Sequence, residues 1–367
     1  MPKEVKNREN RVGMLPTGVR ALVQDGHQVH VQQNAGIGSG ILDAAYVDAG
    51  AIIVPTAEEA WATDMVVKVK EPQASEFPLM KSGQTLFTYL HLAAEAKLTE
   101  ELLARGVTSI AYETVQDPDR NLPLLRPMSE VAGRMSVQVG AFYLQSSWDM
   151  DSTGRGVLLG GVPGVLPGNV VILGGGVAGA NAALVALGMG ARVKILDVNP
   201  RRLEYLDHVL SGRVCTLMSN IDNIHESAKE ADLLIGAVLV PGARAPKLVT
   251  KETIAAMPQG SVVVDIAVDQ GGCIETCRPT SHENPTYTVD GVVHYCVTNM
   301  PGAVARTSTF ALTNVTLGFT QMLAKLGPEK AAQASGPLSL GFHTYRGELV
   351  HQPTADAHQM KFTPLKF

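Results

Sequence analysis

The chain has 367 residues, a formal net charge of −5, and 45% hydrophobic against 18% charged residues. This composition is too apolar for an intrinsically disordered protein. The absence of a basic excess weakens any nucleic-acid-binding function. The length predicts two domains or one large α/β unit.

In the first third of the chain, short apolar strands alternate with helical stretches. We expect strands at 27–32, 51–54, 65–69, 84–90 and 108–112, and helices at 41–49, 57–62 and 98–105. This alternation is typical of a parallel sheet with helices on both faces. Residues 116–127 are loop-like. Ser129 then has the character of an N-cap for a helix that runs to about residue 148.

A second series follows a connector, residues 154–168, that is dense in Gly and Pro. We expect strands at 170–173, 193–196, 214–217, 233–237, 262–266 and 292–297, and helices at 178–189, 200–210, 221–231 and 251–256. Asn199 caps one of these helices, with Pro200 at its first position. A long helix at about 304–326 then leads into the C-terminal tail. The fold class is therefore α/β with two doubly wound domains.

The strongest motif is VVILGGGVAG at 170–179. Gly174, Gly176 and Gly179 satisfy the spacing of a dinucleotide-binding loop between an apolar strand and a helix. Asp197 ends the next strand, where its carboxylate can accept hydrogen bonds from ribose hydroxyls. An acid at that position repels a 2′-phosphate, which favours NAD over NADP. The alternative is a Gly-rich turn followed by an ordinary strand-end Asp.

Three residues outside this motif are candidates for chemistry. Lys70 and His91 follow predicted strands of the first domain, at the sheet edge where open α/β folds bind ligands. Arg11 lies in a polar N-terminal segment, NRENRVGMLP. Each also has a plain structural interpretation: a solvated Arg, a Lys whose stem covers apolar surface, and a His satisfied within the core.

In the second domain, Asp265 and Asp269 follow a fully apolar strand. Asp269 is placed on the crevice side of the nucleotide sheet, or else it caps a turn. The loop at 296–302 is a second candidate wall of that pocket. Cys273 and Cys277 have no partners in a metal-like register, and we interpret them as structural.

The sequence predicts a cytoplasmic protein. Its four cysteines form no Cys-x-x-Cys pair, its N-terminus lacks an apolar stretch, and its most apolar run, 233–240, is too short to cross a membrane. We expect small-molecule substrates and neither nucleic-acid nor membrane partners.

These motifs resemble the alanine dehydrogenase family, which includes the nucleotide-binding part of proton-translocating transhydrogenase. The resemblance covers nearly the whole chain, and it is carried by segments such as KVKEP, FTYLHLAAE, PMSEVAGRMS, LGGGVAG, DIAVDQGGC and CVTNMPGAVARTSTFALTN. It implies a substrate domain, 1–127 plus 306–367, into which an NAD-binding Rossmann-like domain, 128–305, is inserted. It also implies a hexamer.

The resemblance assigns roles by position. Arg11 and Lys70 hold the substrate carboxylate and carbonyl, His91 is the general acid/base, and Asp269 is the second catalytic residue. NAD is expected to bind along the Gly-rich loop and at the following positions: Ser129, Val177, Ala178, Asp197, Arg202, Ser219, Val238, Leu239, Ile266, Ala267, Val268, Asp269, Arg278, Val297, Thr298, Asn299 and Met300.

Two departures from the family pattern stand out. Family members begin with a short apolar strand before PKE, which this sequence lacks, so we expect a less stable first domain and a loosely held Arg11. Some members bind magnesium through a Glu, matched by Glu113, and a His of the last long helix. That helix position reads Lys325-Leu326 here, and no metal is expected.

The expected reaction is the reversible, NAD-dependent oxidative deamination of L-alanine to pyruvate and ammonium. Each proton transfer near neutral pH suits a His, and a substrate carboxylate suits the fork of an Arg. Two alternatives stay open. One is a non-catalytic NAD(H)-binding module of the transhydrogenase type, and the other is an amino-acid dehydrogenase with a larger substrate such as saccharopine.

Overall fold

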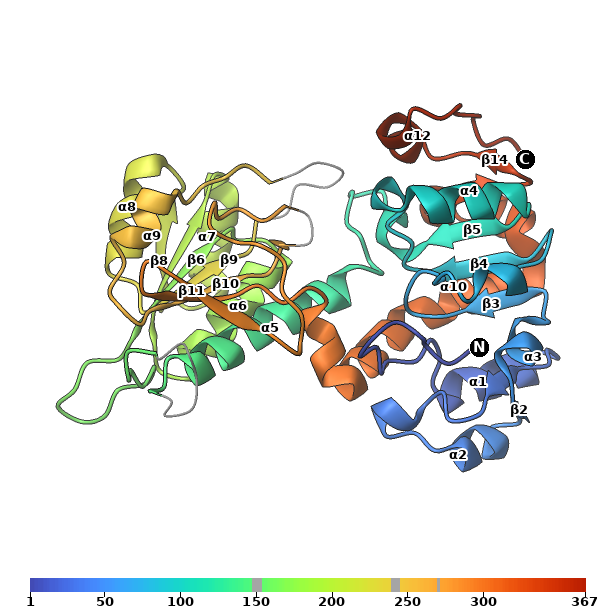
Figure 1. Ribbon diagram of the computed structural model, residues 1–367, viewed down its shortest axis with the longest axis horizontal. Coiled ribbons are helices and arrows are strands. Elements are labelled where there is room, and N and C mark those ends of the chain that lie inside the picture. The colour runs from blue at the N-terminus through green and yellow to red at the C-terminus, as the bar shows by residue number, and fades with distance from the viewer. Residues whose placement is uncertain (147–153, 239–244, 269–270) are drawn as a thin grey trace. The chain divides into compact units, whose positions relative to one another are not determined.

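The computed structural model describes residues 1–146, 154–238, 245–268 and 271–367 (Figure 1). The chain forms two compact units. Unit 1 comprises Met1–Met128 and Gly302–Phe367, and unit 2 comprises Ser129–Pro301. Unit 2 is therefore an insertion between two segments of unit 1. The boundaries expected from the sequence, after residues 127 and 305, differ from these by a few residues.

Unit 2 is built on a seven-stranded sheet in the order β11-β12-β10-β9-β6-β7-β8. All its strand pairs are parallel except that of β11 with β12. The strands are β6 (Asn169–Leu173), β7 (Arg192–Asp197), β8 (Cys215–Met218), β9 (Leu233–Gly236), β10 (Val262–Asp265), β11 (Thr286–Val289) and β12 (Val292–Tyr295). The helices are α6 (Val177–Gly188), α7 (Pro200–Val209), α8 (Ile221–Lys229) and α9 (Lys251–Ala255).

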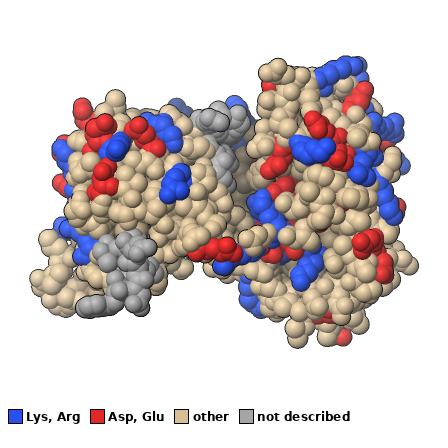
Figure 2. All heavy atoms as spheres, viewed as in Figure 1, with Lys and Arg blue, Asp and Glu red and all other residues tan. Residues whose placement is uncertain are grey.

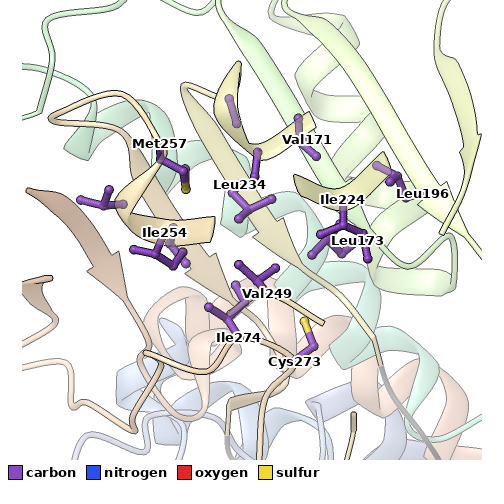
Figure 3. Close-up of a cluster of buried hydrophobic side chains, with 14 of the residues drawn as sticks. Val171, Leu173, Leu196, Ile224, Leu234, Val249, Ile254, Met257, Cys273 and Ile274 are labelled. Carbon is purple, nitrogen blue, oxygen red and sulfur yellow. The ribbon is translucent and has the colours of Figure 1, made fainter. Parts of the chain in front are cut away.

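The strand order of this sheet reverses at β6. From β6 the chain winds outward through β7 and β8, and it then returns to place β9 on the other side of β6. In open α/β sheets, ligands bind outside the carboxyl ends of the strands at such a reversal. The sheet and its helices enclose a buried apolar cluster that includes Val171, Leu234, Val249 and Ile254 (Figure 3).

Unit 1 contains a five-stranded sheet in the order β14-β13-β5-β4-β3 and a two-stranded parallel pair, β1-β2. Its strands are β1 (His30–Gln32), β2 (Ile52–Val54), β3 (Met65–Val67), β4 (Thr85–Thr88), β5 (Thr108–Ala111), β13 (Phe342–Tyr345) and β14 (Glu348–Leu349). Its helices are α1 (Pro16–Gln24), α2 (Asp43–Asp48), α3 (Ala57–Trp61), α4 (Ala96–Ala104), α10 (Ala305–Ala334), α11 (Gly336–Ser339) and α12 (Gln352–His358). β3, β4 and β5 are parallel, so their carboxyl ends share one edge.

Three sequence expectations are corrected. Helix α5 spans Arg126–Tyr143, so Ser129 lies inside its first turn and is not its N-cap; Pro127 is tolerated because the first N–H groups of a helix have no partner within it. The long helix α10 continues past residue 326, but Gly327 (φ 73°) interrupts its helical geometry before Pro328. The C-terminal tail, for which no strand is predicted, adds β13 and β14 to the sheet.

The first residues of the chain pair with β1. The Met1 amine donates to the His30 carbonyl (2.7 Å), and the Gln32 amide donates to the Met1 carbonyl (3.0 Å). Met1 also packs in a buried apolar cluster with Val12, Leu15 and Val31. The N-terminal segment that carries Arg11 is thus tied into unit 1 at its beginning.

Acidic and basic side chains are interspersed on the visible surface of each unit (Figure 2), so neither shows an extended field of one sign on this face. Within the described residues, every helix is too short or too polar to cross a lipid bilayer.

Candidate active site

The Gly-rich loop after β6 depends on three glycines. Gly174 has a φ of +97°, which a residue with a Cβ rarely adopts. A Cβ on Gly179 would lie 1.9 Å from the Gly174 carbonyl oxygen, so helix and loop pack too closely for any side chain. A Cβ on Gly176 would meet nothing within 4 Å. The open space at Gly176, beside the N-terminus of α6, fits a phosphate group.

Asp197, the last residue of β7, holds the backbone of this loop by hydrogen bonds. Its carboxylate accepts the Gly175 amide (2.7 Å) and the Asn199 amide (2.8 Å). Arg202 donates to the carbonyl oxygens of Gly175 (2.5 Å) and Gly176 (3.3 Å), so its guanidinium braces the loop. The family resemblance assigns Arg202 to NAD binding, and these contacts give it a structural role in the loop as well.

A glycine of α5, which the sequence reading did not single out, completes this region. A Cβ on Gly133 would lie 2.1 Å from the carbonyl oxygen of Ala178, in the first turn of α6. Arg134 also donates to the Asn181 side chain (2.9 Å). The segment SEVAGRM therefore supports the helix that begins at the Gly-rich loop.

The remaining predicted cofactor residues follow strands of the same sheet. Ser219 comes after β8, Val238 after β9, Ile266, Ala267 and Val268 after β10, and Val297, Thr298, Asn299 and Met300 after β12. Because these strands are parallel, the residues lie along one edge of the sheet. Arg278 instead lies 4.3 Å over the Tyr287 ring. Leu239 and Asp269 lie outside the described residues.

In unit 1, three polar side chains follow three neighbouring parallel strands. Lys70 comes shortly after β3, His91 after β4, and Glu113 after β5. The Thr88 hydroxyl donates to the Lys70 carbonyl (3.0 Å), which joins the first two strand ends. The carboxyl edge of this sheet therefore brings two predicted site residues together with one whose role the sequence left unassigned.

Arg11 is fixed in place, contrary to the expectation of a loose residue. It is 2% exposed, and Glu9 accepts from its Nε (2.7 Å) and Nη2 (2.6 Å). Its Nη1 lies 3.1 Å from the Met128 sulfur. Burial opposes its charge, but the Glu9 carboxylate outweighs burial and raises the pKa of Arg11. A buried bidentate pair of this kind sets the plane of the guanidinium.

Lys68 forms the centre of a buried ion cluster that the sequence did not reveal. It is fully buried, and its ammonium contacts Glu76 (2.9 Å) and Glu4 (3.2 Å). Glu4 also accepts the amides of Val69 (2.6 Å) and Lys70 (3.4 Å). The cluster therefore holds the backbone that presents Lys70. In the sequence, both lysines of KVKEP look alike.

Unlike that of Lys68, the environment of the Lys70 ammonium disfavours its charged form. Burial lowers the pKa of Lys70, and the neighbouring charge of Arg11 lowers it further. Two cations held close together repel each other, and a bound anion relieves that repulsion. The pair of Arg11 and Lys70 is thus suited to a small carboxylate.

His91 adopts a left-handed backbone conformation, with a φ of +50°. The Glu113 carboxylate stabilises this turn by accepting the amides of His91 (2.6 Å) and Leu90 (3.1 Å). The His91 ring is stacked on Tyr89, with ring centroids 6.0 Å apart, and its side chain is 41% exposed. A titratable ring is thereby held at the sheet edge with access to solvent, as proton transfer requires.

The chain matches two family descriptions. Residues 1–132 match "Alanine dehydrogenase/PNT, N-terminal domain", and residues 136–352 match "Alanine dehydrogenase/PNT, C-terminal domain". Among curated proteins, it is 58% identical over 363 residues to "Alanine dehydrogenase 2" of Staphylococcus aureus (strain USA300), which covers 99% of this chain and 96% of that one.

Solved structures show similar folds. One titled "L-alanine dehydrogenase" is 55% identical, has a TM-score of 0.94, and covers 98% of each chain. The transhydrogenase from Sinorhizobium meliloti is 28% identical, with a TM-score of 0.79 over 95% of this chain and 97% of that chain. The alanine dehydrogenase is the more similar of the two in sequence and in structure.

Proposed function

The chain belongs to the alanine dehydrogenase/PNT family, and from this we infer that it catalyses the reversible NAD-dependent oxidative deamination of L-alanine. L-alanine, NAD⁺ and water yield pyruvate, ammonium, NADH and a proton. The observation that carries this inference is 58% identity over nearly the full length of an alanine dehydrogenase. Bound NAD supplies the hydride acceptor.

We propose that unit 1 recognises the substrate. The Arg11 guanidinium, oriented by Glu9, binds the carboxylate, and the Lys70 ammonium polarises the carbonyl of pyruvate in the reverse direction. Burial and, after it, the charge of Arg11 lower the pKa of Lys70, and a bound anion would offset both effects, which supports an anionic ligand.

His91 is proposed as the general acid/base. Hydride leaves Cα only when the substrate amine is neutral, so a base must first take a proton from the ammonium group. After hydride transfer, water adds to the substrate iminium, and the resulting carbinolamine loses ammonia. The partly exposed ring, held by Tyr89 stacking and the turn that Glu113 stabilises, is suited to exchange these protons. Asp269 is proposed to hold the amine and to offset the charge of the iminium.

The predicted contacts of NAD are proposals of the same kind. The space at Gly176 and the N-terminus of α6 would take the pyrophosphate, and Asp197 would accept from the adenosine ribose. The residues that follow β9, β10 and β12 would line the nicotinamide end.

A panel assay tests the activity and both alternatives. NADH oxidation is followed with ammonium and with pyruvate, 2-oxobutyrate, glyoxylate, or 2-oxoglutarate plus lysine as substrate. We expect pyruvate to give the highest kcat/KM. Tight NADH binding without turnover of any oxo acid would indicate a transhydrogenase-type module. A preference for 2-oxoglutarate plus lysine would indicate a larger-substrate dehydrogenase.

The assembly and the cellular location are proposed on coarser grounds. We propose a hexamer in the cytoplasm. Four apolar side chains of the 154–168 connector, Leu158, Val162, Val165 and Leu166, are 53–70% exposed, as expected of a surface covered by another copy. The four cysteines are free, which agrees with a reducing compartment. Light scattering and cell fractionation test these two proposals.

A further inference from the structure

Asp265 is a buried carboxylate for which the proposed chemistry has no direct use. It is the last residue of β10, and its exposed fraction is 0%. Burying a carboxylate is unfavourable unless hydrogen bonds or charges compensate it. Its contacts therefore indicate what the charge is for.

The Asp265 side chain organises the loop that follows it. One oxygen accepts the Ala267 amide (3.1 Å), and the other accepts the Cys273 amide (3.0 Å). These two amides lie on either side of Asp269 in the sequence. Two further hydrogen bonds close the loop, from Gly272 to the Ala267 carbonyl (3.0 Å) and from Gly271 to the Val268 carbonyl (3.1 Å). One carboxylate thus holds both flanks of the proposed second catalytic residue.

Two glycines, Gly236 and Gly272, leave space for the Asp265 carboxylate. A Cβ on Gly272, which has a φ of +63°, would lie 2.4 Å from an Asp265 oxygen. A Cβ on Gly236 of the neighbouring strand would lie 3.2 Å from the other oxygen. This requirement explains the second glycine of DIAVDQGGC, Gly272.

Lys247 also binds the backbone that follows Asp269 in the sequence. Its ammonium donates to the carbonyl oxygens of Gly271 (2.6 Å) and Ile274 (3.1 Å). It is also the cation whose charge acts on Asp265. The other titratable groups facing the carboxylate are the thiols of Cys273, Cys277 and Cys296. Burial raises the pKa of Asp265 to about 6.

We propose that Asp265 is a positioning residue for the reaction, and that it acts with Lys247. Together they fix the backbone of Ile266–Val268 and of Gly271–Ile274, which flank the proposed catalytic Asp269 in the sequence. Neither residue is proposed to touch substrate. The proposal rests on the proposed function, because Asp269 has its role only there.

The charged form of Asp265 is the effective one. A carboxylate accepts two N–H groups at once, whereas a carboxylic acid or an amide turns one of its two positions into a donor. The loop should therefore loosen when Asp265 is protonated, as the pH falls through about 6. A shift of about 1 Å in a catalytic group can lower the rate by about 10²-fold.

The principal test is Asp265→Asn, with Lys247→Met as a second variant in case the first folds poorly. At a pH well above 6, Asp265→Asn should lower kcat by about tenfold to 10²-fold, while the Kd of NADH changes by less than about threefold. Hydride transfer becomes more rate-limiting, so deuterated NADH should give a larger isotope effect. We expect the wild-type kcat to fall as the pH drops through about 6, and this fall should disappear in the variant. Lys247→Met should show a smaller decrease in kcat.

Asp232→Asn is the matched control. Asp232 is a buried carboxylate of the same sheet that accepts the Asn169 amide (2.7 Å) and pairs with Arg155 (2.8 Å), near the opposite strand ends. The Asp232→Asn substitution should lower thermal stability without changing kcat or the pH profile of kcat. Equal losses of kcat in Asp232→Asn and Asp265→Asn would reduce Asp265 to a structural role and overturn the proposal.

Hydrogen–deuterium exchange gives a readout that does not need turnover. Amides of 266–268 and 271–274 should exchange faster in Asp265→Asn and in Lys247→Met than in the wild type. Wild-type exchange with wild-type kcat in both variants would refute the proposal. A wild-type protein that binds NADH but turns over no oxo acid would instead refute the proposed function, and the exchange data would still show whether Asp265 and Lys247 hold the loop.

Discussion

The two units hold their functional groups by different physical means. In unit 1, the candidate site depends on buried charges that are paired with one another: Arg11 with Glu9, and Lys68 with Glu4 and Glu76. In unit 2, the Gly-rich loop and the loop after β10 are shaped by backbone amides and by glycines without side-chain bulk.

The difference reflects what each unit is proposed to bind. A small carboxylate offers few contacts, so its recognition needs fixed cations, and fixed cations need counter-charges when they are buried. A dinucleotide is large and offers its phosphates to backbone N–H groups and a helix N-terminus. Unit 1 should therefore be sensitive to the loss of single charges, and unit 2 to changes of shape or of hydrogen-bond acceptors.

The variant Lys68→Met tests most directly whether unit 1 is sensitive to the loss of a single charge. It leaves Glu4 and Glu76 buried without their cation, which typically costs about 3–5 kcal/mol. We expect unit 1 to melt at a markedly lower temperature, as followed by calorimetry. The triple variant Lys68→Met, Glu4→Gln, Glu76→Gln should recover part of the loss, because no charge is left unpaired.

Lys97→Ala serves as the control for this variant, since Lys97 pairs with Glu101 on the surface of the same unit and is 71% exposed. Its melting temperature should barely change. If Lys68→Met melted like Lys97→Ala, the buried charges would not be what holds unit 1 together.

The second prediction separates chemistry in unit 1 from cofactor binding in unit 2. His91→Asn should lower kcat by about 10²–10⁴-fold, the usual contribution of general acid–base catalysis. Asn is chosen because it tolerates the left-handed backbone of His91 better than Ala. NADH fluorescence titration should give a nearly unchanged Kd, and the exposed His208→Ala on α7 should leave both quantities unchanged. Activity within about tenfold of wild type would remove the acid/base role.

The contrast between the units also explains what the sequence allowed us to predict. The glycine spacing is readable because a backbone motif requires one residue type at fixed positions, and Gly174 and Gly179 have the geometry that the spacing implies. Lys70 and His91 are readable as residues that follow strands. The partners of Lys68, Glu4 and Glu76, are not, because contacts in the folded chain join them to it.

Helix and strand limits show a similar division. Six strands of unit 2, β6–β10 and β12, lie within about two residues of their predicted positions, because each contains a short apolar run. β11 was not predicted, since TYTV is only partly buried and has no such run. β13 and β14 were missed because FHTY and EL carry little strand signal on their own. They are strands because β13 pairs with β5, far away in the sequence.

A third prediction concerns Asp265, a buried carboxylate of unit 2 that accepts hydrogen bonds from backbone amides. The pKa of Asp265 is raised from 3.8 to about 6 in the folded protein. A raised carboxyl pKa means that the folded state binds the proton more tightly, so its stabilising contribution is present below the unfolded pKa and lost as the pH rises through about 6. The shift corresponds to roughly 3 kcal/mol.

The wild type should therefore lose stability relative to Asp265→Asn as the pH rises from about 4 to about 7. Urea unfolding of both proteins at several pH values measures this difference, and the subtraction cancels groups common to both. A difference that is flat with pH would mean that Asp265 titrates as an ordinary exposed carboxyl group, and that its burial in unit 2 carries no electrostatic cost.

The smallest expected effect tests the side-chain charge on which cofactor choice depends in unit 2. Asp197 already accepts the amides of Gly175 and Asn199, and its carboxylate stands at the strand end where an adenosine ribose would bind. A 2′-phosphate there would meet a negative charge, whereas Arg202 is engaged with the carbonyl oxygens of the loop. We expect kcat/KM with L-alanine to favour NAD over NADP by at least about tenfold, which is about 1.4 kcal/mol. Asp197→Asn should lower the ratio of kcat/KM with NAD to kcat/KM with NADP, because it weakens NAD binding and removes the repulsion of the 2′-phosphate of NADP. An equal or higher rate with NADP in the wild type would show that Arg201 or Arg202 receives the phosphate, and that charge governs ligand choice in unit 2 as it does in unit 1.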